Sequence, residues 1–237
     1  MKTLVIATRN AHKVGEIRAI LGEGFRYLTL TDFPGAPEVI EDAPTFGGNA
    51  TKKAVALALW LAETQDAECM VQSAECRAHN EERWVLADDS GLEVDALGGA
   101  PGVHSARFAA LDSGAAGNSS TAENNTKLLR LLREVPAKRR TARFKCVIAL
   151  VPVSSIQPAT ASPVCYADEA ELQTRLFEGV CEGRIITDPK GRGGFGYDPL
   201  FVPEGYDQTF GELSEAIKNR LSHRARALSA LKKAMPQ

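Results

Sequence analysis

The sequence predicts an α/β fold with a large mixed sheet flanked by helices. Three observations support this prediction: the chain opens with a strand–turn–helix pattern, strand-like and helical segments alternate through its middle, and it closes on a helical pattern. The composition agrees, because 44% hydrophobic and 24% charged residues in a chain of 237 are typical of a folded globular protein. We expect a single domain over residues 1–237.

The chain begins with a strand, a helix and a second strand. Leu4–Thr8 is apolar, and Val14, Ile17 and Leu21 then recur at helical spacing. Phe25–Leu30 is the second strand candidate. The turn between a strand and a helix start is a usual place for a ligand, so this first turn is a candidate site.

The next segments predict a loop, a long helix and a surface excursion. Pro34–Pro44 is rich in proline and acidic residues, which favours a loop. The alanine and leucine density of Thr45–Glu63 predicts a helix with a buried face. Ala67–Arg83 is polar and aperiodic, so we expect a surface excursion there, before a short strand at Trp84–Ala87.

The second half of the chain predicts further strands and one more helix. Ser120–Glu123 has the spacing of a capping box and predicts a helix start, and Thr141–Val151 is a strand candidate. A second irregular excursion is expected over Pro152–Pro163. Two strand-like runs follow within Val164–Ile186 and another within Phe195–Val202.

A single closing helix is expected after a second capping box at Thr209–Glu212. Its apolar stripe comprises Leu213, Ile217, Leu221, Leu228 and Leu231. Lys218, His223 and Arg224 lie off that stripe and are candidate donors to keto oxygens and phosphates. The alternative is a solvated basic helix face.

The charge balance limits the classes of partner. The 28 Lys and Arg residues against 30 Asp and Glu residues leave a net charge of −2, without the basic excess of a nucleic-acid-binding protein. No apolar run approaches the roughly 18 residues of a membrane span, and the N-terminus lacks a signal-peptide pattern. The odd count of 5 cysteines favours a reducing cytoplasm.

The first candidate site is the turn after the first strand. Thr and Asn side chains with free N–H groups at a helix start can bind an anion, and Lys13 adds a positive charge. The candidate phosphate-binding residues are Thr8, Arg9, Asn10, Ala11, His12 and Lys13. The alternative is a turn that only caps the helix.

The second candidate site is the pair Asp88 and Asp89, which follows the apolar run directly. Consecutive carboxylates point in different directions, so one can hold a hard cation while the other positions it or takes a proton. Their repulsion requires a cation or basic neighbours nearby. The alternative is an acidic turn, because Asp-Ser-Gly suits turns.

The third candidate site is a glycine-rich segment. Its glycines match G-x-G-x-x-G: Gly191, Gly193 and Gly196. No helix is expected to follow, so a Rossmann dinucleotide site is excluded. The flexible backbone can approach a ligand closely, with Phe195 and Tyr197 as stacking platforms and Asp198 as an acceptor. The alternative is a glycine-rich hairpin with aromatic core residues.

Five motifs in chain order resemble the inosine/xanthosine triphosphate pyrophosphatase family. They are Ala7–Lys13, Ala87–Leu92, Leu97–Gly102, Gly193–Asp198 and Ser222–Arg224. The match runs nearly end to end. The excursions at 67–83 and 152–163 look like insertions relative to the family.

The resemblance implies an elongated ITPase/Maf-like fold with two lobes around an active cleft, and a homodimer. It implies a cytoplasmic hydrolase, dependent on Mg²⁺ or Mn²⁺, that converts ITP, dITP and XTP to the monophosphate and pyrophosphate. Asp89 would be the general base and a metal ligand, Lys13 would act in catalysis, and Glu41 or Asp88 would be the second metal ligand. The residues around the substrate would be Thr8 to Lys13, Ser90, Phe195, Gly196, Tyr197, Asp198, Lys218, His223 and Arg224.

One position departs from the family pattern. The family commonly has a glutamate where this chain has Gly48, and Glu41, Asp42 or Asp88 could compensate. This departure motivates one alternative, a nucleotide-binding protein with weakened catalysis. A Maf-like nucleotide pyrophosphatase with a different base preference is the other.

Overall fold

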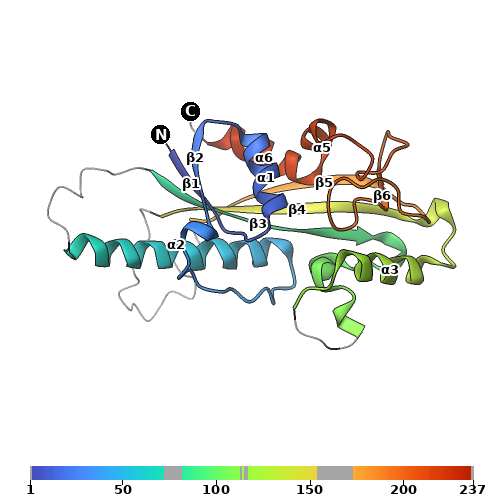
Figure 1. Cartoon of the computed structure of the whole chain (residues 1–237), viewed down its shortest axis with the longest axis horizontal. Helices are drawn as coiled ribbons and strands as arrows, with labels where there is room; N and C mark the ends of the chain where they lie inside the picture. The colour runs from blue at the N-terminus through green and yellow to red at the C-terminus, as the bar shows by residue number, and fades with distance from the viewer. Residues whose placement is uncertain (1, 72–81, 113, 115–116, 154–172, 236–237) are drawn as a thin grey trace. The chain divides into compact units, whose positions relative to one another are not determined.

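A six-stranded mixed sheet forms the framework of the protein (Figure 1). The computed structural model describes residues 2–71, 82–112, 114, 117–153 and 173–235, and for residues 65–71 it describes only the backbone. The strand order is β2-β1-β3-β4-β5-β6. β1 pairs in parallel with β2 and β3, whereas β5 and β6 pair antiparallel. The predicted α/β class with a mixed sheet is confirmed.

The chain divides into two compact units. The first comprises Met1–Asp89 and Val147–Phe177, and the second comprises Ser90–Cys146 and Glu178–Gln237. The chain passes from one unit to the other within β3 (Arg83–Val94), within β4 (Thr141–Pro152) and within β5 (Arg175–Ile185). The active cleft and the single-domain organisation over residues 1–237 stay predictions.

The first unit contains the N-terminal strands and helices. Its elements are β1 (Lys2–Ile6), α1 (Ala11–Leu21), β2 (Phe25–Thr29) and α2 (Phe46–Val71), with parts of β3 and β4. α1 and α2 lie on opposite faces of the sheet in Figure 1. α2 packs small and branched apolar residues against the strands, among them Ala54, Leu57, Ala58 and Leu61. The predicted strand, helix, strand and long helix are confirmed.

The second unit contains α3 (Thr121–Leu132), β6 (Phe201–Pro203), α5 (Glu215–Leu221) and α6 (His223–Ala234), with most of β5 and parts of β3 and β4. The predicted capping box at the start of α3 is confirmed: Ser120 and Glu123 bond reciprocally through side chain and backbone. The core of this unit is rich in aromatic residues, including Phe144, Phe201 and Phe210.

The first predicted excursion, Ala67–Arg83, is wrong at both ends. α2 continues to Val71, because Ala67, Glu68 and Met70 favour helix even where the apolar pattern has ended. Arg83 already belongs to β3. Residues 72–81 lie outside the described residues, as do residues 154–163 of the second excursion and the first strand-like run of Val164–Ile186.

Two predictions for the C-terminal part differ from the structure. The strand predicted within Phe195–Val202 begins only at Phe201, because Gly196–Leu200 forms turns: Gly194 and Gly196 have φ of +72° and +62°, which an extended strand cannot accommodate. The closing helix is two helices, because Ser222 is extended and its Oγ accepts the Ala225 N–H at 3.2 Å. The Thr209–Glu212 bonds close a turn, and α5 starts only at Glu215.

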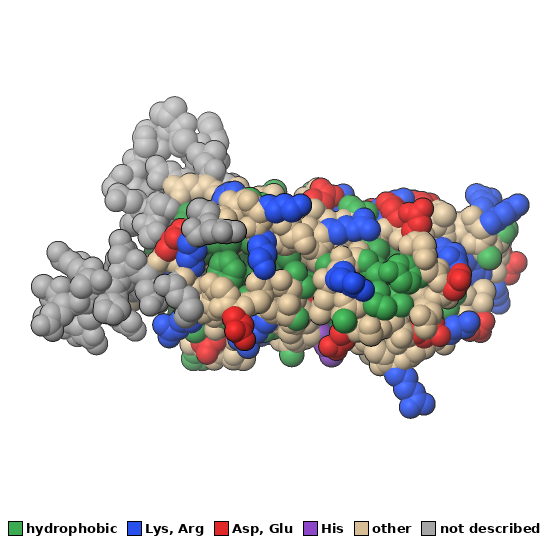
Figure 2. All heavy atoms as spheres, turned by 90° about the horizontal axis from the view of Figure 1, so that it is seen from above, with side chains coloured by type: hydrophobic (Ala, Val, Ile, Leu, Met, Phe, Trp, Pro, Cys, Tyr) green, Lys and Arg blue, Asp and Glu red, His purple; other side chains and the backbone are tan. Residues whose placement is uncertain are grey.

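The surface carries charge of both signs. On the face seen in Figure 2, Lys and Arg side chains are interspersed with Asp and Glu side chains. No helix among the described residues is long and apolar enough to cross a membrane.

Candidate active site

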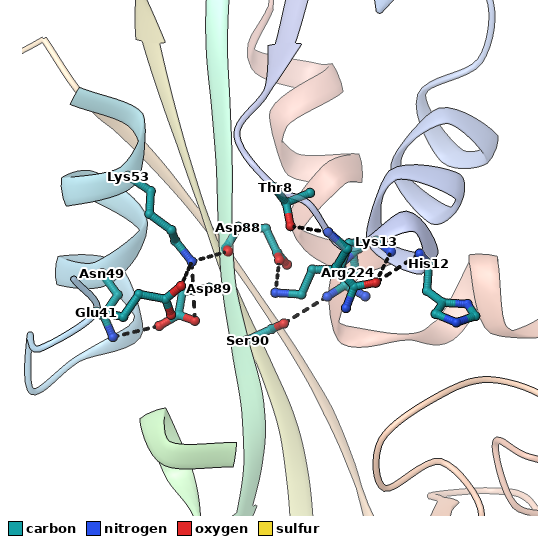
Figure 3. A network of polar contacts seen from close by, with 11 residues as sticks. Thr8, His12, Lys13, Glu41, Asn49, Lys53, Asp88, Asp89, Ser90 and Arg224 are labelled. Carbon is teal, nitrogen blue, oxygen red and sulfur yellow. Dashed lines mark hydrogen bonds and ion pairs between the residues drawn. The ribbon is translucent and has the colours of Figure 1, made fainter. Parts of the chain in front are cut away.

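The turn after β1 is held by its own side chains. The Thr8 Oγ1 accepts the Asn10 N–H at 3.2 Å, and the Asn10 Oδ1 accepts the N–H groups of His12 and Lys13 at 3.0 and 3.3 Å (Figure 3). Asn10 is therefore the N-cap of α1, as the capping alternative predicts. Arg9 is exposed and pairs with Glu38 at 2.8 Å. Anion binding by this turn stays a prediction.

Asp88 and Asp89 lie inside a strand and not in a turn, so the acidic-turn alternative is wrong. β3 continues from Arg83 to Val94, and both carboxylates are largely buried within it. Successive side chains of a strand point to opposite faces of a sheet. The two carboxylates accordingly meet different helices, which neutralise them and permit the strand to continue.

Asp88 faces α1. Its carboxylate forms an ion pair with Lys13, and its side chain has no exposed surface. The backbone carbonyl of Asp88 accepts a hydrogen bond from Lys53 Nζ at 2.8 Å. The predicted basic neighbour of the acidic pair is therefore present, in the residue that sequence analysis assigned to the phosphates.

Asp89 faces α2, which supplies two residues that sequence analysis missed. Asn49 Nδ2 donates to Asp89 Oδ2 at 3.0 Å, and Lys53 Nζ lies 3.7 Å from Asp89 Oδ1 (Figure 3). Lys53 Nζ also lies 3.3 Å from Glu41 Oε1. A sequence signal existed: Asn49 and Lys53 are one helical turn apart in an otherwise alanine-rich stretch, and such a pair shares one helix face.

Burial raises the pKa of Asp89, which is only 6% exposed. The positive charges of Lys53 and Lys13 and the hydrogen bond from Asn49 act in the opposite direction and do not cancel the effect of burial. A carboxylate with a raised pKa is a stronger base than one in water, and such groups cluster at functional sites.

Gly48, at the position where the family pattern has a glutamate, lies in the first turn of α2 and packs against the loop that precedes this helix. A Cβ on Gly48 would lie 2.8 Å from Ala43 Cβ and 3.2 Å from Thr45 Oγ1. Asn49 Oδ1 holds this loop by accepting the Ala43 N–H at 2.9 Å. A side chain at position 48 therefore requires the loop to shift, whereas Glu41 already brings a carboxylate to Lys53 Nζ.

In the second unit, a buried ion pair organises the glycine-rich segment. Asp198 Oδ2 accepts hydrogen bonds from Lys218 Nζ at 2.7 Å and from the Phe195 N–H at 2.8 Å. A Cβ on Gly194 would lie 2.1 Å from the same oxygen, so this position requires glycine. Lys218 Nζ is also 4.9 Å from the centre of the Phe195 ring, within cation–π range.

Tyr197 is not a stacking platform. Its ring is buried in the core, and its hydroxyl donates to the Ser105 carbonyl at 2.9 Å. Burial also raises the pKa of Tyr197, so the phenol stays a neutral donor. Only Phe195, which is half-buried, retains the predicted role as a candidate stacking ring.

Lys218, His223 and Arg224 of the last two helices are all buried, so the alternative of a solvated basic face is wrong. Lys218 is 5% exposed and Arg224 is 0% exposed. Arg224 donates to Ser90 Oγ at 2.9 Å (Figure 3), and the His223 ring stacks on Phe144 at 4.8 Å. Gly179 was not among the residues predicted from the sequence, yet its lack of a side chain permits β5 and the start of α6 to lie close together: a Cβ there would lie 2.1 Å from the His223 carbonyl.

These features define an α/β protein with a buried acid–amide–lysine network in one unit and a buried cationic network in the other. Residues 4–234 match the Ham1 family, and the chain belongs to that family. It is similar to the dITP/XTP pyrophosphatase of Shouchella clausii, with 42% identity over 232 residues that cover 98% of this chain and 96% of the relative. The dITP/XTP pyrophosphatase of Desulforamulus reducens is 45% identical over 233 residues, covering 98% and 93%.

Solved structures agree with the sequence relatives. A HAM1 protein from Coxiella burnetii has a TM-score of 0.71 and 32% identity, with 98% of each chain covered. A nucleoside-triphosphatase / dITP/XTP pyrophosphatase from Mycobacterium abscessus has a TM-score of 0.62 and 34% identity, covering 97% of this chain and 98% of that one. The family resemblance found in the five motifs is confirmed.

Proposed function

We propose that this chain hydrolyses ITP, dITP and XTP to the nucleoside monophosphate and pyrophosphate, and so removes deaminated purines from the nucleotide pool. One observation carries the proposal: Asp89 is a buried carboxylate of raised pKa, held by Asn49 and flanked by Lys53. That arrangement is suited to a general base, and it occurs in a chain whose relatives are named dITP/XTP pyrophosphatases.

Asp89 accepts the proton of the attacking water in this proposal. The water oxygen forms a bond to the α-phosphorus, the bond from that phosphorus to the bridging oxygen breaks, and pyrophosphate leaves with the electron pair. The Asn49 N–H holds one carboxylate oxygen, which leaves the other oriented toward the water. Lys53 lies near both Asp89 and Glu41 and balances their negative charge.

The residues present fit a divalent cation. Asp89 and Glu41 both approach one ammonium group, that of Lys53, which supports a site for positive charge near them. Mg²⁺ is usually held by one or two carboxylates together with substrate phosphates, so this small donor set is sufficient although the described residues contain no group of three ligands. We assign Asp89 and Glu41 to Mg²⁺ and not Asp88, whose carboxylate is engaged by Lys13. When bound, Mg²⁺ or Mn²⁺ supplies positive charge to the phosphate oxygens.

The turn from Thr8 to Lys13 is assigned to the triphosphate. The dipole of α1 favours an anion at this end of the helix, although the Asn10 side chain already accepts the N–H groups of His12 and Lys13. Lys13 keeps the buried Asp88 carboxylate as its partner and adds positive charge at the start of α1 for a phosphate oxygen. Lys13 then contributes positive charge near the phosphate oxygens, where negative charge develops or shifts in the transition state.

The purine base is assigned to residues of the second unit. The Phe195 ring offers a stacking face, and Lys218, His223 and Arg224 offer donors, with Ser90 held by Arg224. A donor aimed at a 6-oxo group would meet a 6-amino group donor to donor. Such a site can reject the mismatched base by roughly 10⁴-fold.

Further properties belong to the same proposal. The family resemblance supports a homodimer. The odd cysteine count supports a reducing, cytoplasmic compartment. We also treat residues 1–237 as a single catalytic domain with its two excursions as insertions.

A panel of nucleoside triphosphates tests the proposal. Pyrophosphate release is measured with ITP, dITP, XTP, ATP, GTP, dTTP and UTP in the presence of Mg²⁺, at neutral and alkaline pH. We expect ITP, dITP and XTP to be preferred. A preference for dTTP or UTP would indicate a Maf-like enzyme, and binding of ITP without hydrolysis at any Mg²⁺ or Mn²⁺ concentration would indicate a protein with lost catalysis.

A further inference from the structure

Asn125 on α3 is a buried amide that the proposed chemistry does not use. It is 9% exposed, and its Nδ2 donates to the Gly196 carbonyl at 3.2 Å, across 71 positions of sequence. Its Oδ1 is also buried and has no hydrogen-bond partner among the described residues. A buried acceptor left in this way is costly, so a half-satisfied amide calls for an explanation beyond stability.

The adjacent residue shows what a purely structural amide does on this helix. Asn124 Oδ1 accepts the Ala109 N–H at 2.8 Å, and its Nδ2 donates to the Ala106 carbonyl at 3.1 Å. Both halves of Asn124 are satisfied by the backbone of one neighbouring segment. Asn125 differs because its amide group bonds to Gly196, in the segment assigned to the substrate.

Glycine is favoured at position 196 by its backbone conformation and not by lack of space. Its φ is +62°, whereas a Cβ at this position would meet no atom within 4 Å. The carbonyl and N–H of a trans peptide point in opposite directions, so the amide that holds the Gly196 carbonyl also sets the direction of the Tyr197 N–H. Two further hydrogen bonds hold the segment: the Phe195 N–H donates to the Asp198 carboxylate, and the Tyr197 hydroxyl donates to the Ser105 carbonyl.

We propose that Asn125 is a positioning residue that fixes the Gly196–Tyr197 peptide for binding of the purine nucleotide. The Asn125 amide bonds directly to the carbonyl of this peptide, which lies between the stacking ring of Phe195 and the buried Tyr197. An apolar side chain, like that of Leu128 on the same helix, would suit the buried position better if packing were its only role. Positioning of the peptide gives the Asn125 amide a role that an apolar side chain could not fill. This inference rests on the proposed function.

Two variants and a matched control test the inference. Asn125→Asp keeps the shape and one acceptor but replaces the N–H donor, so a carboxylate oxygen faces the Gly196 carbonyl. Asn125→Leu removes both polar atoms at similar volume. Thr126→Val is the control, because Thr126 is the exposed neighbour and its hydroxyl bonds within α3, to the Ala122 carbonyl.

We expect both Asn125 variants to raise KM for ITP and the dissociation constant for IMP about tenfold, with kcat changed less than about threefold. Hydrogen–deuterium exchange over residues 195–200 should accelerate about tenfold without nucleotide. The control should match the wild type in all of these. If the Leu variant does not fold, the near-isosteric Asp variant carries the same test.

If a folded Asn125→Asp protein has the KM and the IMP affinity of the wild type, the inference is overturned. A lower melting temperature alone does not support it, because loss of a purely structural residue would also lower stability. Unchanged exchange over residues 195–200 also overturns it. Failure of the proposed function looks different: the wild type releases no pyrophosphate from ITP, while the exchange experiment still reports whether Asn125 holds the segment.

Discussion

Asn49 donates its side-chain amide to Asp89 Oδ2 at 3.0 Å while its carbonyl oxygen holds the Ala43 N–H at 2.9 Å. One buried side chain on α2 therefore connects the proposed base to the loop that carries Glu41. Both halves of this amide are satisfied, so its orientation is fixed before any substrate arrives. Preorganised polar groups of this kind are the usual source of catalytic rate in enzymes that move charge.

Asp89→Asn should reduce kcat for ITP by about 10²–10⁴-fold, because the amide keeps the shape of the carboxylate but cannot accept the proton. Pyrophosphate release under saturating ITP measures the effect, and circular dichroism confirms the fold. Asp42→Asn is a suitable control, since Asp42 is exposed and pairs with Lys52. Turnover by Asp89→Asn within threefold of wild type would remove Asp89 from the role of base.

Glu41→Gln should raise the Mg²⁺ concentration for half-maximal activity about tenfold, because one of the two assigned carboxylates is lost. Titration of Mg²⁺ at fixed ITP measures it, and Mg²⁺ binding to the nucleotide-free protein by calorimetry gives a second readout. Asp42→Asn should leave both measurements as in the wild type. An equal shift in the two variants would point to general charge in the loop and not to a ligand.

Gly179→Ala should destabilise the protein by about 1–3 kcal/mol and raise KM for ITP, because the new Cβ would lie 2.1 Å from the His223 carbonyl and 2.5 Å from the Ala227 N. α6 must then move away from β5, and His223 and Arg224 move with it. Urea unfolding and steady-state kinetics measure the two effects.

Gly15→Ala is the matched control for this substitution. Gly15 lies within α1, and a Cβ at this position would meet no atom within 4 Å, so the variant should gain about 0.5–1 kcal/mol of stability through helix propensity. Loss of stability in Gly15→Ala, or none in Gly179→Ala, would contradict the packing argument.

The stability of the second unit should depend on pH through Asp112. The hydrogen bond from Lys127 lowers the pKa of Asp112, and Arg130 adds to the effect. Because the folded-state pKa lies below the unfolded one, this contribution is present above about pH 4 and is lost as the pH falls through the folded-state value.

Asp112→Asn removes that dependence. We expect the difference in unfolding free energy between the wild type and Asp112→Asn to be constant from about pH 5 to about pH 8 and to shrink below about pH 4. Urea denaturation at a series of pH values measures it, with Glu134→Gln as an exposed control in the same unit. A difference that stays constant down to about pH 2 would contradict the assignment.

Local patterns predicted much of the fold. The strands at β1, β2 and β4, the helices α1 and α2, and the capping box of α3 all depend on residues close together in sequence, so periodicity and side-chain-to-backbone bonds identified them. The same holds for the turn at Asn10, whose cap acts on its own helix.

Predictions failed where contacts between residues distant in sequence determine the secondary structure or the burial of a side chain. Asp-Ser-Gly favours a turn locally, yet β3 runs through it because Lys13 and Lys53 from two different helices neutralise the carboxylates. The sequence around Lys218 and Arg224 is consistent either with hydrogen-bond donors to a ligand or with a solvated basic helix face. Their burial depends on Asp198 and Ser90, which lie 20 and 134 positions away in the sequence respectively.

The amino-acid sequence by itself determined the α/β class, the family and most members of the candidate site, since these depend on residue type and on order along the chain. Only the tertiary structure decided which side chains act together: Asn49 and Lys53 with Asp89, Tyr197 in the core instead of on a ligand, and Asn125 on the Gly196 carbonyl. The physical reason is that burial and hydrogen bonding between distant segments set the charge and direction of each polar group, and no local pattern encodes them.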